Sequence, residues 1–189
     1  RAIDPTVPPP RPPQPPVRAL FASQPGIDRL TRRLVHAAFD AAAIDTRHTV
    51  LSGFLPDDGE TATDADSRFP VLDADGALLT PSTGARNAEY VRAAPPLFAE
   101  AARTALADAA VVPGEVTHVV TVSCTGLFAP GPDYRLVRDL GLPATVQRFH
   151  LGFVGCAAAL PALRLASALC AADAEAVVLV VCGELCTLH

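Results

Sequence analysis

The sequence predicts an α/β fold, because short apolar runs alternate with helical patterns along its second half. Three runs rich in β-branched and aliphatic residues, at 117–124, 145–152 and 176–184, have the length and composition of buried strands. Stretches with helical spacing separate them, at 133–140 and 157–171. Strands that are apolar throughout and joined by helices pair mainly in parallel. We therefore expect an α/β fold with parallel strand pairing and with helices on both faces of the sheet.

The composition sets the class of protein. The chain has 189 residues, of which 50% are hydrophobic, so it can bury a core without disulfides or a metal. Its formal net charge of −5 argues against a surface that binds nucleic acid. The longest strongly apolar run, 176–182, is too short to span a bilayer. We expect neither a nucleic-acid partner nor a membrane span.

The first residues are rich in proline. Eight of the 19 prolines lie within the first 16 residues, and such a segment favours an extended polyproline II conformation without internal hydrogen bonds. We expect residues 1–19 to form a flexible arm and residues 20–189 to form one domain. A ligand for an SH3-type domain is the alternative interpretation of the arm.

The segment after the arm predicts one helix and a long loop. Residues 27–43 place apolar side chains at helical spacing, with arginines largely on the opposite side. Residues 53–82 are rich in Asp, Gly, Thr and Pro and should form a loop, with a hairpin around Asp75-Gly76.

Two further helices are expected before the first strand. Residues 84–93 and 95–110 both have helical patterns, and the pair Pro95-Pro96 lies between them. Proline lacks the backbone N–H that a helix interior needs. The sequence therefore predicts two helices that meet at the prolines.

The cysteines indicate the compartment. Their number is odd, none forms a Cys-x-x-Cys pair, and all lie in apolar stretches; they are Cys124, Cys156, Cys170, Cys182 and Cys186. This usage predicts a reducing cytoplasm rather than a disulfide framework. The run Cys182, Cys186, His189 has a spacing that could suggest zinc, but no second ligand pair stands at a suitable spacing. We expect no metal site.

Cys156 is the candidate nucleophile. It follows Gly155 at a junction between a strand and a helix, the layout of a nucleophile elbow. The first turn of a helix has unpaired N–H groups that favour a thiolate. The alternative is a small buried core residue, which is the commoner role of a lone cysteine. His150, six residues earlier on the strand, is a poor candidate for the base.

The loop 123–134, SCTGLFAPGPDY, follows the end of the first strand. Sites of α/β proteins gather at such strand ends. Its glycine spacing matches neither of the common phosphate-binding patterns. The loop is either the wall of a cavity beside Cys156 or a turn built from turn residues.

These residues carry a resemblance to a family. The segments THVVTVSCTGLFAPGPDYRLVRDLGLPATVQRFHLGFVGCAAALPALRLA (117–166) and AVVLVVCGELCTLH (176–189) closely resemble the type III polyketide synthases, the chalcone-synthase-like members of the thiolase superfamily. They look most similar to the bacterial alkylpyrone and alkylresorcinol synthases. Residues 44–51 and 83–106 also resemble the upstream part of that family. The resemblance implies the N-terminal half of a thiolase-like α/β fold, a mixed sheet with largely parallel strands and helices on both faces.

The resemblance also implies an activity. Cys156 would accept a long-chain acyl group from coenzyme A, and malonyl-CoA would decarboxylate and extend it to pyrone or resorcinol products. Coenzyme A thioesters would be substrates, and no cofactor is implied. Four residues would match positions that contact substrate: Cys124, Ala129, Cys186 and His189.

Two departures from the family pattern stand out. The family's catalytic His and Asn and a gatekeeping Phe lie in its C-terminal half, whereas this sequence ends at His189, about halfway. Three positions that are basic in plant members, where they bind the phosphates of coenzyme A, are Leu34, Ala37 and Ala41 here. Arg32 and Arg33 are the candidate substitutes, and a solvated helix face is the alternative for them.

The resemblance further implies a homodimer formed across the N-terminal halves, and a half-length piece should expose a large apolar face. Two other functions remain open from the sequence. One is a non-catalytic scaffold or dimerisation half of the same fold. The other is a ketoacyl synthase of fatty-acid type, which shares the cysteine elbow.

Overall fold

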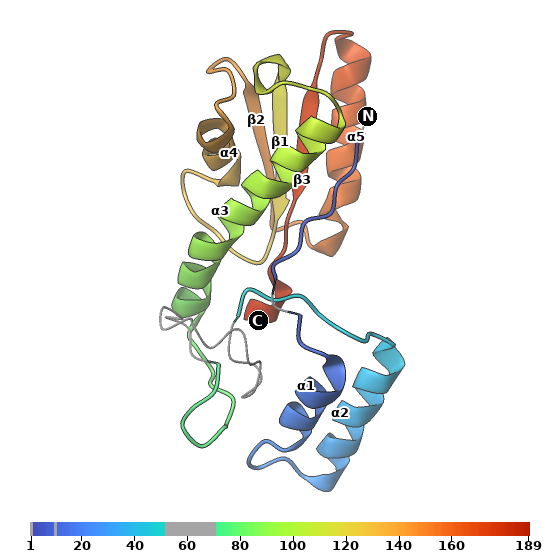
Figure 1. Ribbon diagram of the computed structural model, residues 1–189, viewed down its shortest axis with the longest axis vertical. Helices are drawn as coiled ribbons and strands as arrows, with labels where there is room; N and C mark the ends of the chain where they lie inside the picture. The colour runs from blue at the N-terminus through green and yellow to red at the C-terminus, as the bar shows by residue number, and fades with distance from the viewer. Residues whose placement is uncertain (1, 10, 52–70) are drawn as a thin grey trace. The chain divides into compact units, whose positions relative to one another are not determined.

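The computed structural model describes residues 2–9, 11–51 and 71–189 and forms two compact units (Figure 1). One unit is Val7–Ala85, and the other combines Arg1–Thr6 with Arg86–His189. The larger unit contains a sheet with helices on both faces, and the smaller unit contains a helix pair. The two are described separately below.

The sheet has three strands, β1 (His118–Ser123), β2 (Gln147–Gly152) and β3 (Val178–Cys182), in the order β2-β1-β3. Both neighbouring pairs are parallel. The central strand β1 is buried along its whole length, as its β-branched sequence requires. The predicted α/β class and the parallel pairing are therefore confirmed.

One face of the sheet packs against α5 (Ala159–Ala172). Val120 and Val122 of β1 form a buried cluster there with Ala158 and Ala162. The small alanine side chains allow the helix to lie close to the strands. This contact fixes the position of the helical segment that begins at Cys156.

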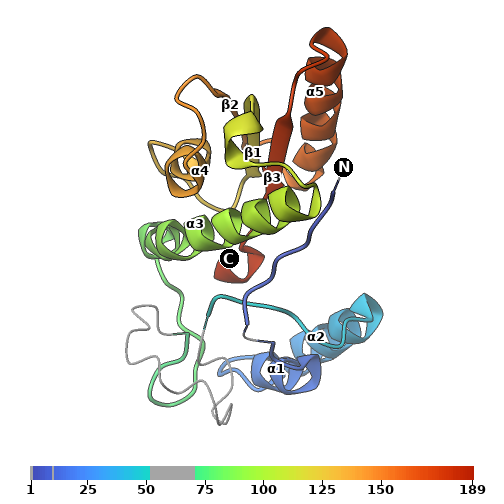
Figure 2. The same ribbon diagram turned by 45° about the horizontal axis from the view of Figure 1, so that its top comes forward.

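The opposite face carries α3 (Thr83–Asp108) and α4 (Pro132–Leu140), and Figure 2 shows α3 crossing the strands. Tyr90 and Phe98 of α3 are buried. A side chain on Gly183, just after β3, would lie 1.7 Å from the Phe98 ring. The absence of a side chain at Gly183 is what lets α3 pack this closely.

Helix α3 continues through Pro95 and Pro96, so the prediction of two helices is wrong. Each proline removes one backbone hydrogen bond. The helix persists because Ala94, Pro95 and Phe98 are buried, and the burial of this face offsets the two lost bonds.

The unit Val7–Ala85 corrects the expected extent of the arm. Helix α1 occupies Gln14–Ala22, with Gln14 and Val17 buried, so residues 14–19 are not a flexible arm. Pro15 lies in the first turn, where a helix N–H has no partner within the helix and proline is tolerated. Pro13 forms a bridge with Thr46, which ties this segment to the residues after α2.

The predicted helix over 27–43 is α2 (Arg29–Ala42), capped by the Asp28 side chain. The predicted hairpin is present, with a bridge between Leu72 and Leu78 and with Gly76 at a φ of +80°. The rest of the predicted loop, up to residue 70, lies outside the described residues.

The larger unit exposes an apolar helix face. Leu160 and Leu163 of α5 are 61% and 56% exposed, and Ala162 is the residue of that helix that is buried. Such an exposed face is the one expected for half of a larger fold. Among the described residues, no helix is long and apolar enough to cross a membrane.

Candidate active site at the carboxyl edge of the sheet

Three cysteines follow the carboxyl ends of the three strands. Cys124 comes directly after β1, Cys156 comes four residues after β2, and Cys186 comes four residues after β3. Because the strands are parallel, their carboxyl ends meet at one edge of the sheet. The structure thus brings these predicted residues together, at the edge where α/β proteins usually carry their sites.

Cys156 begins a turn of 3₁₀ helix, η2 (Cys156–Ala158), that runs directly into α5. The preceding turn has two residues with positive φ, Phe153 at +59° and Gly155 at +93°. The side chain of Cys156 is exposed. The predicted strand–turn–helix layout is confirmed, and the interpretation of Cys156 as a buried core residue is wrong.

Glu184 holds the start of the loop after β1. Its carboxylate accepts from the backbone N–H of Cys124 at 2.8 and 3.0 Å, from the N–H and hydroxyl of Thr125 at 3.0 and 2.6 Å, and from the Ser123 hydroxyl at 3.3 Å. Hydrogen bonds to an ionised carboxylate are stronger than neutral ones. Glu184 therefore joins the carboxyl ends of β1 and β3.

The thiol of Cys124 belongs to the same network. Its pKa is raised, first by a hydrogen bond to Glu184 and then by burial and by the negative charges of Glu184, Cys156 and Cys186. A thiol whose pKa is raised stays protonated and reacts slowly as a nucleophile. The environment of Cys124 suits a wall residue better than a second nucleophile.

A buried hydroxyl connects this network to α3. The Tyr90 hydroxyl donates to Ser123 Oγ at 2.6 Å, and Ser123 in turn donates to Glu184. Burial raises the pKa of Tyr90, so the phenol stays protonated and remains a donor. The ring of Tyr90 also lies against Gly126, where a Cβ would be 2.0 Å from it.

The segment after β3 is held by Thr125. The backbone N–H of Leu185 donates to the Thr125 hydroxyl at 2.9 Å, and His189 Nε2 donates to the Thr125 carbonyl at 2.8 Å. Cys186 is exposed and begins the turn η3 (Cys186–Leu188) between these two contacts. Cys186 and His189 therefore lie beside the loop that carries Cys124.

Ala129 is exposed on the outer part of the same loop, next to a cis peptide bond with Pro130. The loop is also tied to α3, because the Asn87 side chain donates to the Leu127 carbonyl and accepts from the Leu127 N–H. Side chains from two other parts of the chain therefore hold this loop, Glu184 after β3 and Asn87 on α3.

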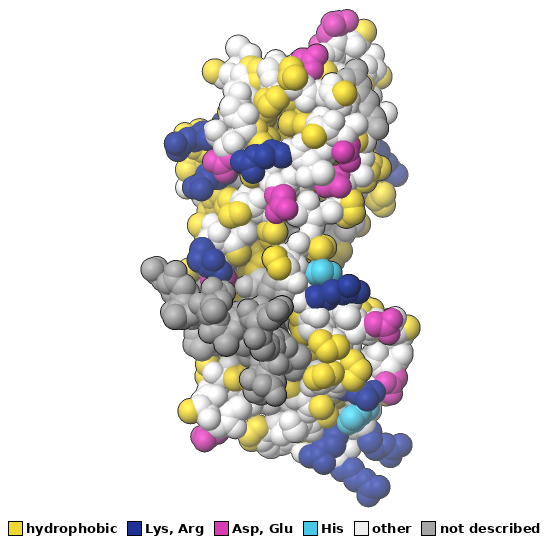
Figure 3. Space-filling view, viewed as in Figure 1, with side chains coloured by type: hydrophobic (Ala, Val, Ile, Leu, Met, Phe, Trp, Pro, Cys, Tyr) yellow, Lys and Arg dark blue, Asp and Glu magenta, His cyan; other side chains and the backbone are white. Residues whose placement is uncertain are grey.

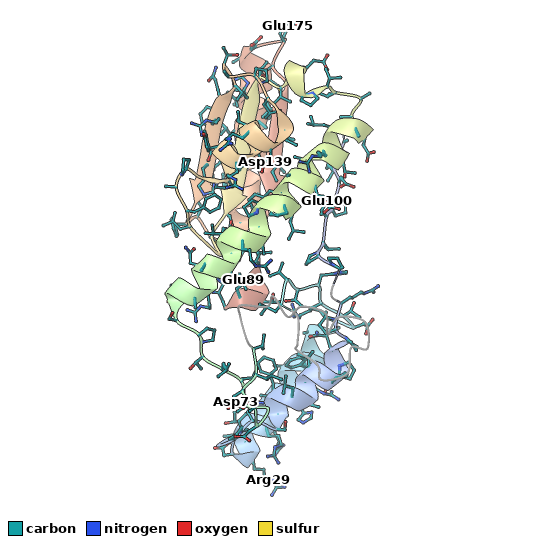
Figure 4. All side chains as sticks on the ribbon, turned by 60° about the vertical axis from the view of Figure 1, so that its left-hand side comes forward. Arg29, Asp73, Glu89, Glu100, Asp139 and Glu175 are labelled. Atoms are coloured by element: carbon teal, nitrogen blue, oxygen red, sulfur yellow. The ribbon has the colours of Figure 1, made fainter. Side chains whose placement is uncertain are left out.

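The two candidate arginines lie in the other unit, on α2. Arg32 donates from Nε to the Ala22 carbonyl at 3.0 Å, and Arg33 is exposed. Basic side chains gather over the α1–α2 pair in Figure 3, and Figure 4 shows Arg29 extending away from it. Both arginines are exposed, which fits a solvated helix face and the binding of phosphates equally.

His150 is accounted for by a neighbouring strand. Its Nδ1 lies 2.9 Å from the Thr121 hydroxyl, at the register position where β2 and β1 pair. The expectation that His150 is not the base at the elbow fits this contact, because the ring is engaged with β1.

Sequence reasoning missed Glu184, Asn87 and Tyr90. Glu184 has a visible signal, since an acidic residue directly after a buried apolar strand points to a polar strand end. Asn87 and Tyr90 lie three residues apart on α3, and their partners are 40 and 33 residues away. No local pattern marks such distant contacts.

The chain is similar to a known protein family and to proteins within it. Residues 32–189 match the model of the N-terminal domain of chalcone and stilbene synthases. "Probable polyketide synthase 1" of Dictyostelium discoideum is 32% identical over 165 residues, which are 84% of this chain and 5% of that protein. Bisdemethoxycurcumin synthase of Oryza sativa subsp. japonica is 41% identical over 109 residues, which are 58% of this chain and 27% of that protein.

A solved structure is similar over nearly the whole chain. PKS-I from the brown alga Ectocarpus siliculosus superimposes with a TM-score of 0.85 at 29% identity, covering 97% of this chain and 47% of that one. The chain thus spans about half the length of this structural relative and smaller shares of the two curated relatives.

Proposed function

The chain belongs to the chalcone and stilbene synthase family, and we propose that the protein is a type III polyketide synthase whose nucleophile is Cys156. The family has the thiolase-type fold, and residues 32–189 match its N-terminal domain. The proposal assigns to the whole protein the condensation of an acyl-CoA starter with malonyl-CoA.

The exposed thiol of Cys156 at the start of a helical segment is the observation that carries the proposal. An exposed thiol can reach a substrate, and the sulfur of a cysteine is a strong nucleophile toward a thioester carbonyl. The neighbouring loop after β1 is held by the hydrogen bonds of Glu184 to Thr125, and Cys156 lies close enough to Cys124 in this loop to help raise the pKa of that thiol.

The proposed chemistry runs through a thioester. The Cys156 thiolate attacks the carbonyl carbon of the acyl-CoA, a new C–S bond forms, and coenzyme A leaves as its thiolate. Malonyl-CoA then loses CO₂, and the carbanion that remains attacks the thioester carbonyl and expels the Cys156 thiolate. Each cycle lengthens the chain by two carbons and restores the nucleophile.

We propose a long-chain starter and pyrone or resorcinol products as the finer assignment. The side chains proposed to contact substrate are small at three of four positions, Cys124, Ala129 and Cys186, and His189 is the fourth. Small side chains along a cavity wall leave room for an extended acyl chain. We also propose that Arg32 and Arg33, which are exposed on α2, bind the coenzyme A phosphates.

We propose that the folded part of this chain, from the start of α1 at Gln14, is one half of a longer enzyme that works as a homodimer in the cytoplasm. The exposed Leu160 and Leu163 of α5 support a covering second half. Strand β2 lies at an edge of the sheet, and the neighbouring Phe153 is 71% exposed, which favours contact with a second copy. The odd number of cysteines and the lack of a Cys-x-x-Cys pair favour a reducing compartment.

Acyl transfer to the intact protein tests the proposal. The full-length protein would be incubated with palmitoyl-CoA, digested and mapped by mass spectrometry, with Cys156→Ala as the test variant and Cys170→Ala, which removes another exposed thiol, as the control. We expect an acyl adduct on Cys156, lost in Cys156→Ala and kept in Cys170→Ala. Acylation elsewhere while Cys156 stays unmodified would overturn it.

Product formation separates the remaining alternatives. A type III synthase should form product from malonyl-CoA directly, whereas a fatty-acid-type ketoacyl synthase should require malonyl carrier protein. A non-catalytic scaffold should give no adduct and no product with either extender.

A further inference from the structure

Asn87 makes a reciprocal pair of hydrogen bonds with the backbone of Leu127. Its Nδ2 donates to the Leu127 carbonyl at 2.8 Å, and its Oδ1 accepts from the Leu127 N–H at 2.7 Å. A side-chain amide offers a donor and an acceptor in one plane, so it can pair with a peptide group as a neighbouring strand would. Aspartate lacks the donor, and alanine lacks both groups.

The hydrogen bonds of Asn87 hold the loop between its two ends. The start of the loop, at Cys124 and Thr125, is held by Glu184. The end of the loop leads into α4, which begins at Pro132. Asn87 holds Leu127, in the outer stretch between these two points and two residues before Ala129.

Helix α3 contacts the loop through two residues one turn apart. Asn87 binds Leu127, and Tyr90 packs against Gly126 and lies 6.2 Å from the Phe128 ring. Residues three apart on a helix share one face. The course of this helix can be followed in Figure 4 from Glu89, the neighbour of Tyr90, to Glu100. Since α3 also packs on the sheet through Phe98, it supports the loop from a rigid element.

We propose that Asn87 is a positioning residue. It fixes the position of the loop 124–131 and thereby the selectivity of the enzyme for the length of the starter acyl chain. This rests on the proposed function, because the loop is taken to form the wall beside Cys156. Asn87 binds the backbone of the loop, so its effect on substrate passes through the loop and not through direct contact.

The effect should depend on chain length. A long acyl chain that extends from Cys156 along the wall contacts the loop, so its binding depends on the position of the loop. An acetyl group is too short to reach the loop. Loss of the Asn87 pair should raise KM for palmitoyl-CoA by about threefold to tenfold, because hydrogen bonds at an exposed site have modest net strength. It should leave kcat and the KM for acetyl-CoA within about twofold.

The test compares four variants with the unsubstituted full-length protein. Asn87→Ala removes both hydrogen bonds, Asn87→Asp keeps only the acceptor, and Asn87→Gln keeps both groups on a longer side chain. Ala88→Ser, at the exposed next position of α3, is the control. The readouts are steady-state kinetics with both starters and hydrogen exchange of the peptide that contains Leu127.

We expect a selective rise in KM for palmitoyl-CoA and faster exchange at Leu127 in Asn87→Ala and Asn87→Asp, with partial recovery in Asn87→Gln and no change in Ala88→Ser. An equal loss of kcat with both starters would mean that Asn87 is only structural, and unchanged exchange at Leu127 would mean that it does not hold the loop. Either result overturns the inference.

Failure of the proposed function looks different. If the unsubstituted protein forms no Cys156 adduct with any acyl-CoA, the proposed function is wrong. The inference that Asn87 controls starter selectivity is then wrong as well. The exchange comparison still decides whether Asn87 holds the loop.

Discussion

Glu184 Oε2 accepts both the backbone N–H and the hydroxyl of Thr125, at 3.0 and 2.6 Å. The two residues are 59 positions apart and follow β3 and β1 respectively. Through this double contact one carboxylate determines where the loop after β1 leaves the sheet.

Substitution Glu184→Gln should therefore destabilise the protein. The amide keeps one acceptor oxygen but replaces the other with an NH₂ group. This group would face the hydroxyl and N–H donors of residues 123–125, which leaves buried polar groups unpaired. We expect the free energy of unfolding to fall by about 1–3 kcal/mol in chemical denaturation. Glu175→Gln, at an exposed position in the loop before β3, is the matched control and should change it little. Equal effects of the two substitutions would contradict the role of Glu184.

The same carboxylate should control the reactivity of Cys124. Because Glu184 helps to raise the pKa of this thiol, less thiolate is present at a given pH and alkylation is slow. Alkylation of Cys124 by iodoacetamide, followed by mass spectrometry as a function of pH, should show its midpoint above 9.0, the ordinary value for a cysteine. In Glu184→Gln the midpoint should move to lower pH, and an unmoved profile would argue against the contact.

Two glycines are required by the packing of α3. A Cβ at Gly126 would lie 2.0 Å from the Tyr90 ring, and a Cβ at Gly183 would lie 1.7 Å from the Phe98 ring. Gly126→Ala and Gly183→Ala should each lower the free energy of unfolding by about 1–3 kcal/mol, because the rings must move. Gly114→Ala, with nothing within 4 Å of its Cβ, is the control. Partial recovery in Gly183→Ala combined with Phe98→Leu would locate the cause at the ring.

Much of the fold follows from local patterns. The strands and α4 appear in the sequence because their apolar spacing matches the burial they reach, and the Gly155-Cys156 junction is visible as a glycine between a strand and a helix. These features depend on residues close together in the chain. The hairpin at Asp75-Gly76 is predictable for the same reason.

The features that sequence reasoning missed depend on distant contacts. The continuity of α3 through Pro95-Pro96 rests on burial that a local rule does not contain. Helix α1 starts among prolines because Pro13 pairs with Thr46, 33 residues away in the chain. The part of the site formed by Glu184 and Asn87 likewise depends on partners that only the folded sheet brings near.

Helix α2 should respond to acid through its cap. Asp28 accepts from the Thr31 N–H, which lowers the pKa of the carboxyl from 3.8. A lowered pKa means that the cap stabilises the folded form above 3.8 and that this contribution is lost as the pH falls through the lower value. The protection factor of the Thr31 amide, which corrects the exchange rate for the intrinsic effect of pH, should fall over that window. In Asp28→Asn, which caps without titrating, the fall should be absent, and a similar fall there would exclude Asp28 as its source.

The backbone of Gly155 should control acylation of Cys156. Its φ of +93° and ψ of −175° lie in a region that only glycine adopts readily, so Gly155→Ala must rotate the peptide directly before the nucleophile. A displacement of about 1 Å can lower the rate of a positioned reaction by about a hundredfold. We expect a loss of that order in the rate of Cys156 acylation per folded molecule, measured with the folded fraction determined in parallel. Gly141→Ala, which also forces a positive φ but at the end of α4, should lower stability while leaving that rate within about twofold. If both variants lose the rate equally, the loss reflects general destabilisation and not the placement of Cys156.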